Sequence, residues 1–216
     1  MGTAPLPRGE GDRARAHSGF RPTPLLAHAA TAPEPLGRQS VAKAIAVLIG
    51  SPGSGKSTVG EALARRLDAD LLCTDTEVEK RAGKPIGDIF VEDGEERFRA
   101  LEREVVAEGL RAWEGVIAVG GGAVLDEDTQ RDLAEHHVVY LQVEFGEAAK
   151  RVGMDVARPL LAGNPRTRLR QLLNERLPVY ERLATVTVET TGYHPEEIVD
   201  AILPSLAGQG SGKAQQ

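Results

Sequence analysis

Short apolar segments alternate with helical patterns along most of the chain. The run from Ala44 to Ile49 is unbroken apolar and ends at Gly50, as expected for a strand covered on both faces. Similar runs follow at residues 70–73, 116–119, 138–141 and 186–188. Amphipathic stretches lie between them, and one such helical face comprises Phe98, Leu101, Val105 and Leu110. The alternation predicts an α/β fold: a parallel sheet with helices on both faces and ligands beyond the carboxyl ends of its strands.

The two ends of the chain differ from this core. Residues 1–42 are rich in Pro, Ala and Arg and show neither a helical period nor strict alternation, so we expect a disordered extension. Residues 208–216 are Gly-rich and polar and should form a flexible tail. The segment between them, 43–207, is long enough for one domain with a sizeable core.

Composition limits the possible partners. The 216-residue chain has 26 Lys and Arg against 32 Asp and Glu, a net charge of -6 that argues against a general nucleic-acid binder. No apolar run reaches the roughly 20 residues that a membrane span requires. The single cysteine, Cys73, excludes an internal disulfide and a Cys-cluster zinc site. We therefore expect a soluble, cytoplasmic protein with neither nucleic acid nor membrane as a partner.

The first strand leads into Gly-Ser-Pro-Gly-Ser-Gly-Lys-Ser at residues 50–57, which fits the phosphate-loop pattern G-x-x-x-x-G-K-[ST] in full. Glycines let backbone N–H groups surround an anion at the start of the following helix. Lys56 should bridge the β- and γ-phosphates, and the Ser57 hydroxyl should ligate Mg²⁺. The absence of an Asn-Lys-x-Asp string favours ATP over GTP. The residues expected to contact the nucleotide are Gly53, Ser54, Gly55, Lys56, Ser57 and Thr58.

Candidate residues for a phosphate acceptor follow later strands. Asp75 should project into the crevice facing the loop, where a carboxylate can accept a proton from a hydroxyl; the alternative is a carboxylate favoured only by a helix N-terminus. The triplet at residues 120–122 allows close approach of a ligand, or forms only a tight turn. Arg176 lies in a helical stretch, 172–180, that Pro178 should interrupt. Any single arginine is most often a solvated surface residue.

Taken in order, these strings resemble the shikimate kinase family. The resemblance runs from about Val47 to Ile202 and is carried by the phosphate loop, Thr74-Asp75, Ile89-Phe90, Phe98-Arg99 with Glu102, Gly120-Gly121-Gly122-Ala123, Arg158-Pro159-Leu160-Leu161, and Arg176 before Tyr180. It implies a nucleoside-monophosphate-kinase-like three-layer fold, with a five-stranded parallel sheet in the order 2-3-1-4-5, a lid at about 151–164, and a monomer. It also implies transfer of the γ-phosphate of ATP, with Mg²⁺, to the 3-hydroxyl of shikimate, a step toward chorismate and the aromatic amino acids.

The resemblance assigns roles to individual residues. Lys56, Asp75 and Arg158 would be catalytic: Asp75 would bind the shikimate hydroxyls and orient or accept a proton, and Arg158 would close over ATP. The remaining implied contacts are Arg99 and Arg176 with the shikimate carboxylate, the N–H groups of Gly120, Gly121 and Gly122 with the acceptor, Phe90 and Phe98 near its ring, Glu102 with an arginine, Arg151 at the base of the lid, and the stretch from Gly192 to Pro195 beside the adenine.

One position departs from the family pattern. Cys73 stands where the family normally has an Asp that holds the Mg²⁺ hydration shell, and Mg²⁺ prefers oxygen ligands to a neutral thiol. The departure predicts weaker use of Mg²⁺–ATP, unless Cys73 is simply a small strand residue that the site tolerates. It leaves two alternatives open: a shikimate kinase-like protein with weak or no catalysis, and a kinase for another small polyol acid.

Overall fold

The computed structural model describes residues 44–153 and 165–207. The predicted extension, the tail, Arg158 and most of the predicted lid lie outside these ranges. Within them, no helix is both long and apolar enough to cross a membrane.

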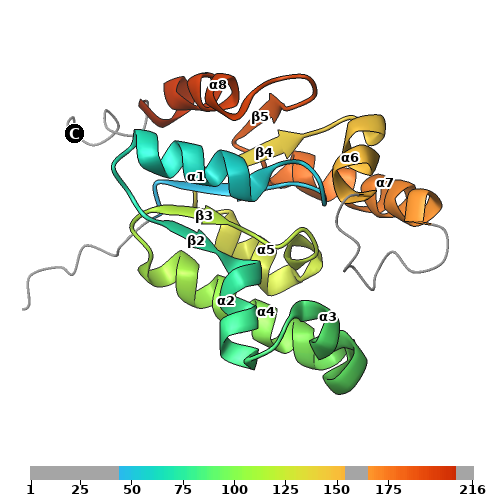
Figure 1. Ribbon diagram of the computed structural model, residues 1–216. Helices are drawn as coiled ribbons and strands as arrows, with labels where there is room; N and C mark the ends of the chain where they lie inside the picture. Colours follow the sequence, from blue (N-terminus) through green and yellow to red (C-terminus); the bar gives the residue numbers. More distant parts are fainter. Residues whose placement is uncertain (1–43, 154–164, 208–216) are drawn as a thin grey trace, which may run out of the picture. The chain divides into compact units, whose positions relative to one another are not determined.

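The core of the fold is a parallel sheet of five strands in the order β2-β3-β1-β4-β5 (Figure 1). The prediction of the α/β class and of this strand order is confirmed. The strand bounds are β1 Ala46–Ile49, β2 Leu71–Cys73, β3 Val116–Ala118, β4 Val138–Gln142 and β5 Val186–Glu189. Strand β1 lies at the centre of the sheet, between β3 and β4. The phosphate loop that follows β1 therefore starts at the middle of the sheet's carboxyl edge.

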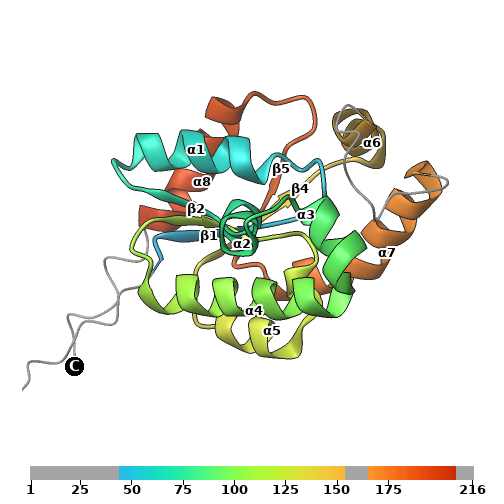
Figure 2. The same ribbon diagram turned by 60° about the horizontal axis from the view of Figure 1, so that its bottom comes forward.

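Helices cover both faces of the sheet (Figures 1 and 2). Helix α1 and helix α8 pack on one face, where they form a core with Leu48 of β1; on the other face α4, α5 and α7 pack against Val47 and Ile49. Because successive strand residues point to opposite faces, both sets are buried, which explains the unbroken apolar run. The principal helices are α1 Lys56–Arg66, α2 Thr74–Ala82, α4 Gly94–Ala112, α5 Glu127–Leu133, α6 Phe145–Gly153, α7 Pro165–Leu183 and α8 Pro195–Ala207.

Three shorter segments complete the described fold: α3 Ile86–Asp88, a π-helical turn at Ile89–Asp93 and a 3₁₀ turn at Ala123–Leu125. The π-helical turn leads directly into α4 and carries Phe90 toward Phe98, with 4.6 Å between the ring centroids. These two aromatic side chains therefore pack together; their predicted place beside the acceptor ring stays a prediction.

The expected break at Pro178 is wrong, because α7 continues through it. A proline removes one helical hydrogen bond, the one to the carbonyl four residues earlier, here that of Asn174. Both Pro178 and Asn174 are exposed, so water can satisfy that carbonyl. On the opposite side of the helix, Arg176 and Tyr180 are buried and hydrogen-bonded, which holds the helix together across the proline.

Candidate active site

The phosphate loop joins β1 to α1. Gly53 and Gly55 have φ angles of +82° and +90°, in the left-handed region that side chains rarely adopt. A Cβ on Gly53 would lie 2.9 Å from the carbonyl oxygen of Ala148, so α6 packs directly on the loop. The loop thus turns tightly into the first turn of α1, where N–H groups and the helix dipole favour an anion. The buried Ser54 hydroxyl has no hydrogen-bond partner among the described residues.

Lys56 begins α1 and folds back over the loop. Its Nζ donates to the carbonyl oxygens of Gly50, at 2.9 Å, and Ser51, at 3.1 Å. The ammonium is therefore held against the loop backbone, within reach of a bound phosphate. The next two predicted nucleotide contacts, Ser57 and Thr58, are exposed on the first turn of α1.

Arg151 connects the loop with two other elements. Its Nη1 donates to the carbonyl oxygen of Gly53 at 3.2 Å, and its Nη2 donates to that of Thr190, just after β5, at 3.3 Å. Its Nε also pairs with Glu147 Oε1, one turn earlier on α6, at 3.2 Å. The residue predicted at the base of the lid is thus brought to the phosphate loop. Pro195, predicted beside the adenine, begins α8 a few residues after Thr190.

Two carboxylates meet on the acceptor side at Gly120, the first residue after β3 and Val119. A Cβ on Gly120 would lie 2.6 Å from Asp75 Oδ1 and 2.7 Å from Glu102 Oε1, so any side chain at this position would displace a carboxylate. Asp75 stands at the second position of α2, directly beyond the end of β2. Glu102 is only 3% exposed, and burial raises the pKa of its carboxyl group, an effect that the nearby Arg99 guanidinium partly offsets.

Arg99 lies on α4 beside this pair. Its Nη1 donates to Glu102 Oε2 at 2.6 Å, and its Nη2 to the exposed Glu95 at 3.3 Å. Its guanidinium also stacks on the Phe98 ring, 5.1 Å from the centroid, and a Cβ on Gly122 would overlap it. The predicted Phe-Arg motif therefore faces the glycine triplet.

Arg176 approaches the same triplet from α7. The side chain is 4% exposed, and its Nη1 donates to the carbonyl oxygen of Gly121 at 2.9 Å. Its Nε is buried and has no hydrogen-bond partner among the described residues. A Cβ on Gly121 would lie 3.1 Å from the carbonyl oxygen of Gly50 and 3.4 Å from Pro52 Cδ. The triplet therefore touches the phosphate loop on one side and a buried, incompletely paired cation on the other.

Comparisons with known proteins point to one family. A family model described as shikimate kinase matches residues 52–207. A shikimate kinase of Thermobifida fusca is 65% identical over 166 residues, covering 77% of this chain and 96% of the relative. The chain belongs to the shikimate kinase family. Among solved structures, shikimate kinase from Acinetobacter baumannii in complex with shikimate is 34% identical, with a TM-score of 0.74 and coverage of 77% of this chain and 94% of that one. The enzyme from Aquifex aeolicus is 36% identical, with a TM-score of 0.67 and coverage of 77% and 98%.

The predicted metal position brings Ser57 close to Cys73. The Ser57 hydroxyl oxygen lies 3.7 Å from Cys73 Sγ. The hydroxyl suits Mg²⁺, whose remaining ligands would be phosphate oxygens and water, but the sulfur does not. Among the described residues, no group of three or more His, Cys, Asp or Glu side chains could hold a metal ion. Of these two neighbouring side chains in the described part of the chain, it is Ser57 that suits Mg²⁺.

Two residues that the sequence analysis did not place in the site hold the glycine triplet. The fully buried Thr74 accepts a hydrogen bond from the Gly120 N–H at 2.8 Å, so this N–H is not available to a ligand as predicted. Tyr180 donates to the carbonyl oxygen of Gly121 at 2.7 Å. Thr74 could have been suspected because it precedes Asp75, whereas the role of Tyr180 has no signature in the sequence beyond its position after Arg176.

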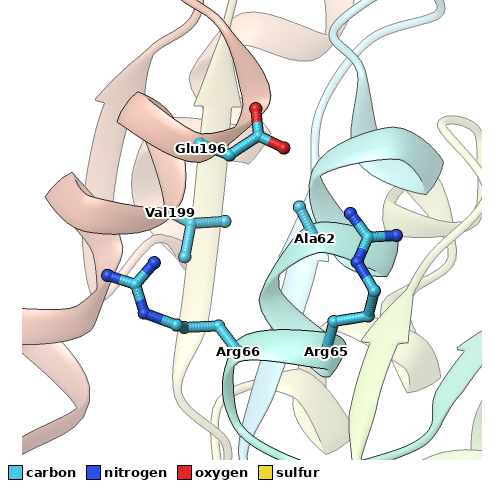
Figure 3. A pocket seen from close by; sticks show the side chains of 5 residues that line it. All are labelled: Ala62, Arg65, Arg66, Glu196 and Val199. Carbon is cyan, nitrogen blue, oxygen red and sulfur yellow. The ribbon is translucent and has the colours of Figure 1, made fainter.

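A separate pocket of about 280 Å³ lies between α1 and α8 (Figure 3). Its lining comes from the later turns of α1 and the start of α8: Ala62, Arg65, Arg66, Glu196 and Val199. Arg66 pairs with Asp200 at 2.6 Å. None of the predicted site residues lines this pocket, so it is not part of the candidate active site.

Proposed function

We propose that the protein catalyses the reaction of ATP with shikimate to give ADP and shikimate 3-phosphate. The proposal rests on the family and, above all, on the buried and unpartnered Nε of Arg176. A buried donor of a charged group costs free energy unless an acceptor meets it. A carboxylate supplies two acceptor oxygens in a plane, which matches the planar fork of a guanidinium. An acceptor that carries a carboxylate therefore suits this position.

The second arginine supports the same acceptor in a different way. Both terminal nitrogens of Arg99 are engaged, one by the buried Glu102 and one by Glu95, whose side chain is 61% exposed. An exposed ion pair is worth at most about 1 kcal/mol, so an incoming carboxylate can replace Glu95 cheaply while Glu102 keeps Arg99 in place. We infer that Arg176 can bind the acceptor carboxylate as it stands. Arg99 would bind the same carboxylate after releasing Glu95.

Asp75 is the residue suited to handle the proton. In the proposed step, the 3-hydroxyl oxygen bonds to the γ-phosphorus while the bond to the β–γ bridging oxygen breaks, and Asp75 orients or accepts the hydroxyl proton. The backbone of the phosphate loop and Lys56 would hold the phosphates, and Arg151 would hold the loop. Mg²⁺, when bound, neutralises phosphate charge, and Ser57 would hold it. Arg158, outside the described residues, remains our proposed donor to the transferred group.

The direct test is ADP release with shikimate, with gluconate, and without an acceptor, together with calorimetric titration of each ligand. Shikimate-dependent ADP release supports the proposal. Equal activity with gluconate would favour a kinase for another polyol acid. Binding of both ATP and shikimate without turnover would favour a non-catalytic relative, a candidate that the contact between Ser57 and Cys73 keeps open. Binding of neither compound refutes the assignment.

Arg176→Lys tests the observation that carries the proposal. Lysine keeps the charge but loses the fork, and a charge-assisted hydrogen bond contributes about 1.5–3 kcal/mol, so the Kd for shikimate should rise about 10- to 100-fold. The matched control is Arg103→Lys, because Arg103 is half-exposed on α4 and pairs with Asp126 at 3.6 Å. Equal shikimate affinity in the two variants would remove Arg176 from the acceptor site.

A further inference from the structure

Tyr180 is a buried polar side chain to which the proposed reaction assigns no role. It is 1% exposed, and its hydroxyl donates to the carbonyl oxygen of Gly121 at 2.7 Å. The same oxygen accepts from Arg176 Nη1 at 2.9 Å. A carbonyl oxygen has two lone pairs, so these two donors saturate it. The shared Gly121 carbonyl oxygen therefore couples the orientation of the Gly121 peptide to that of the Arg176 guanidinium.

Tyr180 is itself held firmly in place. Its ring stacks on that of Tyr140, a residue of β4, with centroids 5.2 Å apart and planes at 17°. Both rings belong to the core on the α4, α5 and α7 face of the sheet. Burial raises the pKa of the Tyr180 hydroxyl to about 12, so the group remains a protonated donor at neutral pH. The sheet thus provides a rigid support for a single hydroxyl.

The far side of the Gly121 peptide meets the nucleotide site. A Cβ on Gly121 would lie 3.1 Å from the carbonyl oxygen of Gly50, the residue at which the phosphate loop begins. On the preceding residue, the Gly120 N–H is fixed by Thr74, next to the proposed proton acceptor. A shift of the Gly121 peptide would therefore change the spacing between the carboxylate-binding arginine, Asp75 and the phosphate loop together.

We propose that Tyr180 is a positioning residue of the acceptor site: its hydroxyl holds the Gly121 peptide and, through the shared carbonyl oxygen, the guanidinium of Arg176. The inference rests on the proposed binding of shikimate. Without the hydroxyl, the Gly121 carbonyl keeps the Arg176 donor of these two, and the peptide and the guanidinium can move as a pair. In this role Tyr180 acts through Gly121 and Arg176, so its loss should weaken acceptor binding and leave nucleotide binding unchanged.

Tyr180→Phe removes this hydroxyl and keeps the stacked ring. A neutral hydrogen bond contributes about 0.5–1.5 kcal/mol, so the Kd and KM for shikimate should rise about 2- to 12-fold. The Kd for ADP should stay within twofold, and amide hydrogen exchange of residues 120–123 should become faster. The matched control is Tyr140→Phe, which removes a hydroxyl from the other ring of the same stack.

The outcomes separate the inference from the function on which it rests. Failure of the parent protein to bind shikimate overturns both. If the parent binds shikimate and Tyr180→Phe binds it equally well, with a melting temperature lowered only as much as in Tyr140→Phe, then Tyr180 is merely a core residue and the inference is wrong. Weaker shikimate binding in Tyr180→Phe alone, with unchanged ADP binding, supports it. Should the variant fold poorly, Thr74→Val removes the other anchor of the triplet and should raise the shikimate Kd in the same direction; an unchanged Kd there would overturn the inference.

Discussion

Replacing Gly120 by alanine should separate acceptor chemistry from nucleotide binding. The new methyl group would lie 2.6 Å from Asp75 Oδ1 and 2.7 Å from Glu102 Oε1, whereas ordinary van der Waals contact begins at 3.4 Å. Both carboxylate oxygens must therefore retreat by about 0.7–0.8 Å, since the shortfalls are 3.4 − 2.6 and 3.4 − 2.7 Å. Glu102 cannot retreat freely, because it is 3% exposed and paired with Arg99 at 2.6 Å. Asp75 must take up most of the displacement.

The expected effect on catalysis is much larger than the effect on stability. Overpacking of this kind costs about 1–3 kcal/mol of folding free energy, which a domain of this size can tolerate. Misplacing a reacting group by about 1 Å costs on the order of 100-fold in rate. We therefore expect Gly120→Ala to remain folded and to lose about 100-fold in kcat/KM for shikimate, because Asp75 no longer meets the hydroxyl, whereas the phosphate loop is not displaced.

Steady-state ADP release, varied separately in ATP and in shikimate, measures this effect. The control is Gly146→Ala on α6, where an added Cβ meets nothing within 4 Å and alanine should stabilise the helix by up to about 1 kcal/mol. The control should keep parental kinetics. The reasoning is refuted if Gly120→Ala retains kcat/KM for shikimate within twofold of the parent, or if it loses ADP affinity as strongly as acceptor activity.

Two further substitutions test the metal position and the buried carboxylate. Cys73→Asp returns an oxygen ligand beside Ser57 and should raise the affinity for Mg²⁺–ADP and kcat/KM for Mg²⁺–ATP by about 10- to 100-fold; calorimetry and kinetics that match the parent would show the carboxylate to be dispensable. Because burial raises the pKa of Glu102 in the folded state, its contribution to stability is complete below its unfolded pKa and is lost as the pH rises through the raised value. Denaturant titrations across this range should therefore show a loss of stability in the parent that is absent from Glu102→Gln, and identical slopes would contradict the assignment.

The strands of the sheet could be predicted because they carry an unambiguous pattern, whereas their order was implied by the resemblance to the shikimate kinase family. In β1, Val47 and Ile49 enter one core and Leu48 the other, so a strand covered on both faces must be continuously apolar. The phosphate loop was equally readable, since its glycines take φ angles that few other residues can adopt. In both cases a local physical requirement restricts residue type directly.

The break expected at Pro178 is wrong because contacts between residues distant in sequence, and not a local requirement, decide the structure there. The local rule is correct about the lost hydrogen bond, but it carries no information about neighbours distant in sequence. Arg176 reaches Gly121 and Tyr180 reaches the same carbonyl, across 55 and 59 positions of the chain. These contacts and the exposure of Asn174 to water outweigh one missing backbone bond. A tertiary contact of this kind can be seen only once the fold is known.

The glycine triplet illustrates what residue type reveals and what it conceals. A run of glycines was expected to present N–H groups to a ligand, yet the Gly120 N–H is bound by Thr74. Glycine is required at these positions by crowding instead: a side chain would collide with two carboxylates at the first position, with the phosphate loop at the second and with Arg99 at the third. The triplet is therefore the place where the proposed proton acceptor, the phosphate loop and the arginines proposed to bind a carboxylate come within contact distance. Because each neighbour constrains a different glycine, an alanine at each position should disturb a different function, and that separation distinguishes a packed junction from a simple ligand-binding loop.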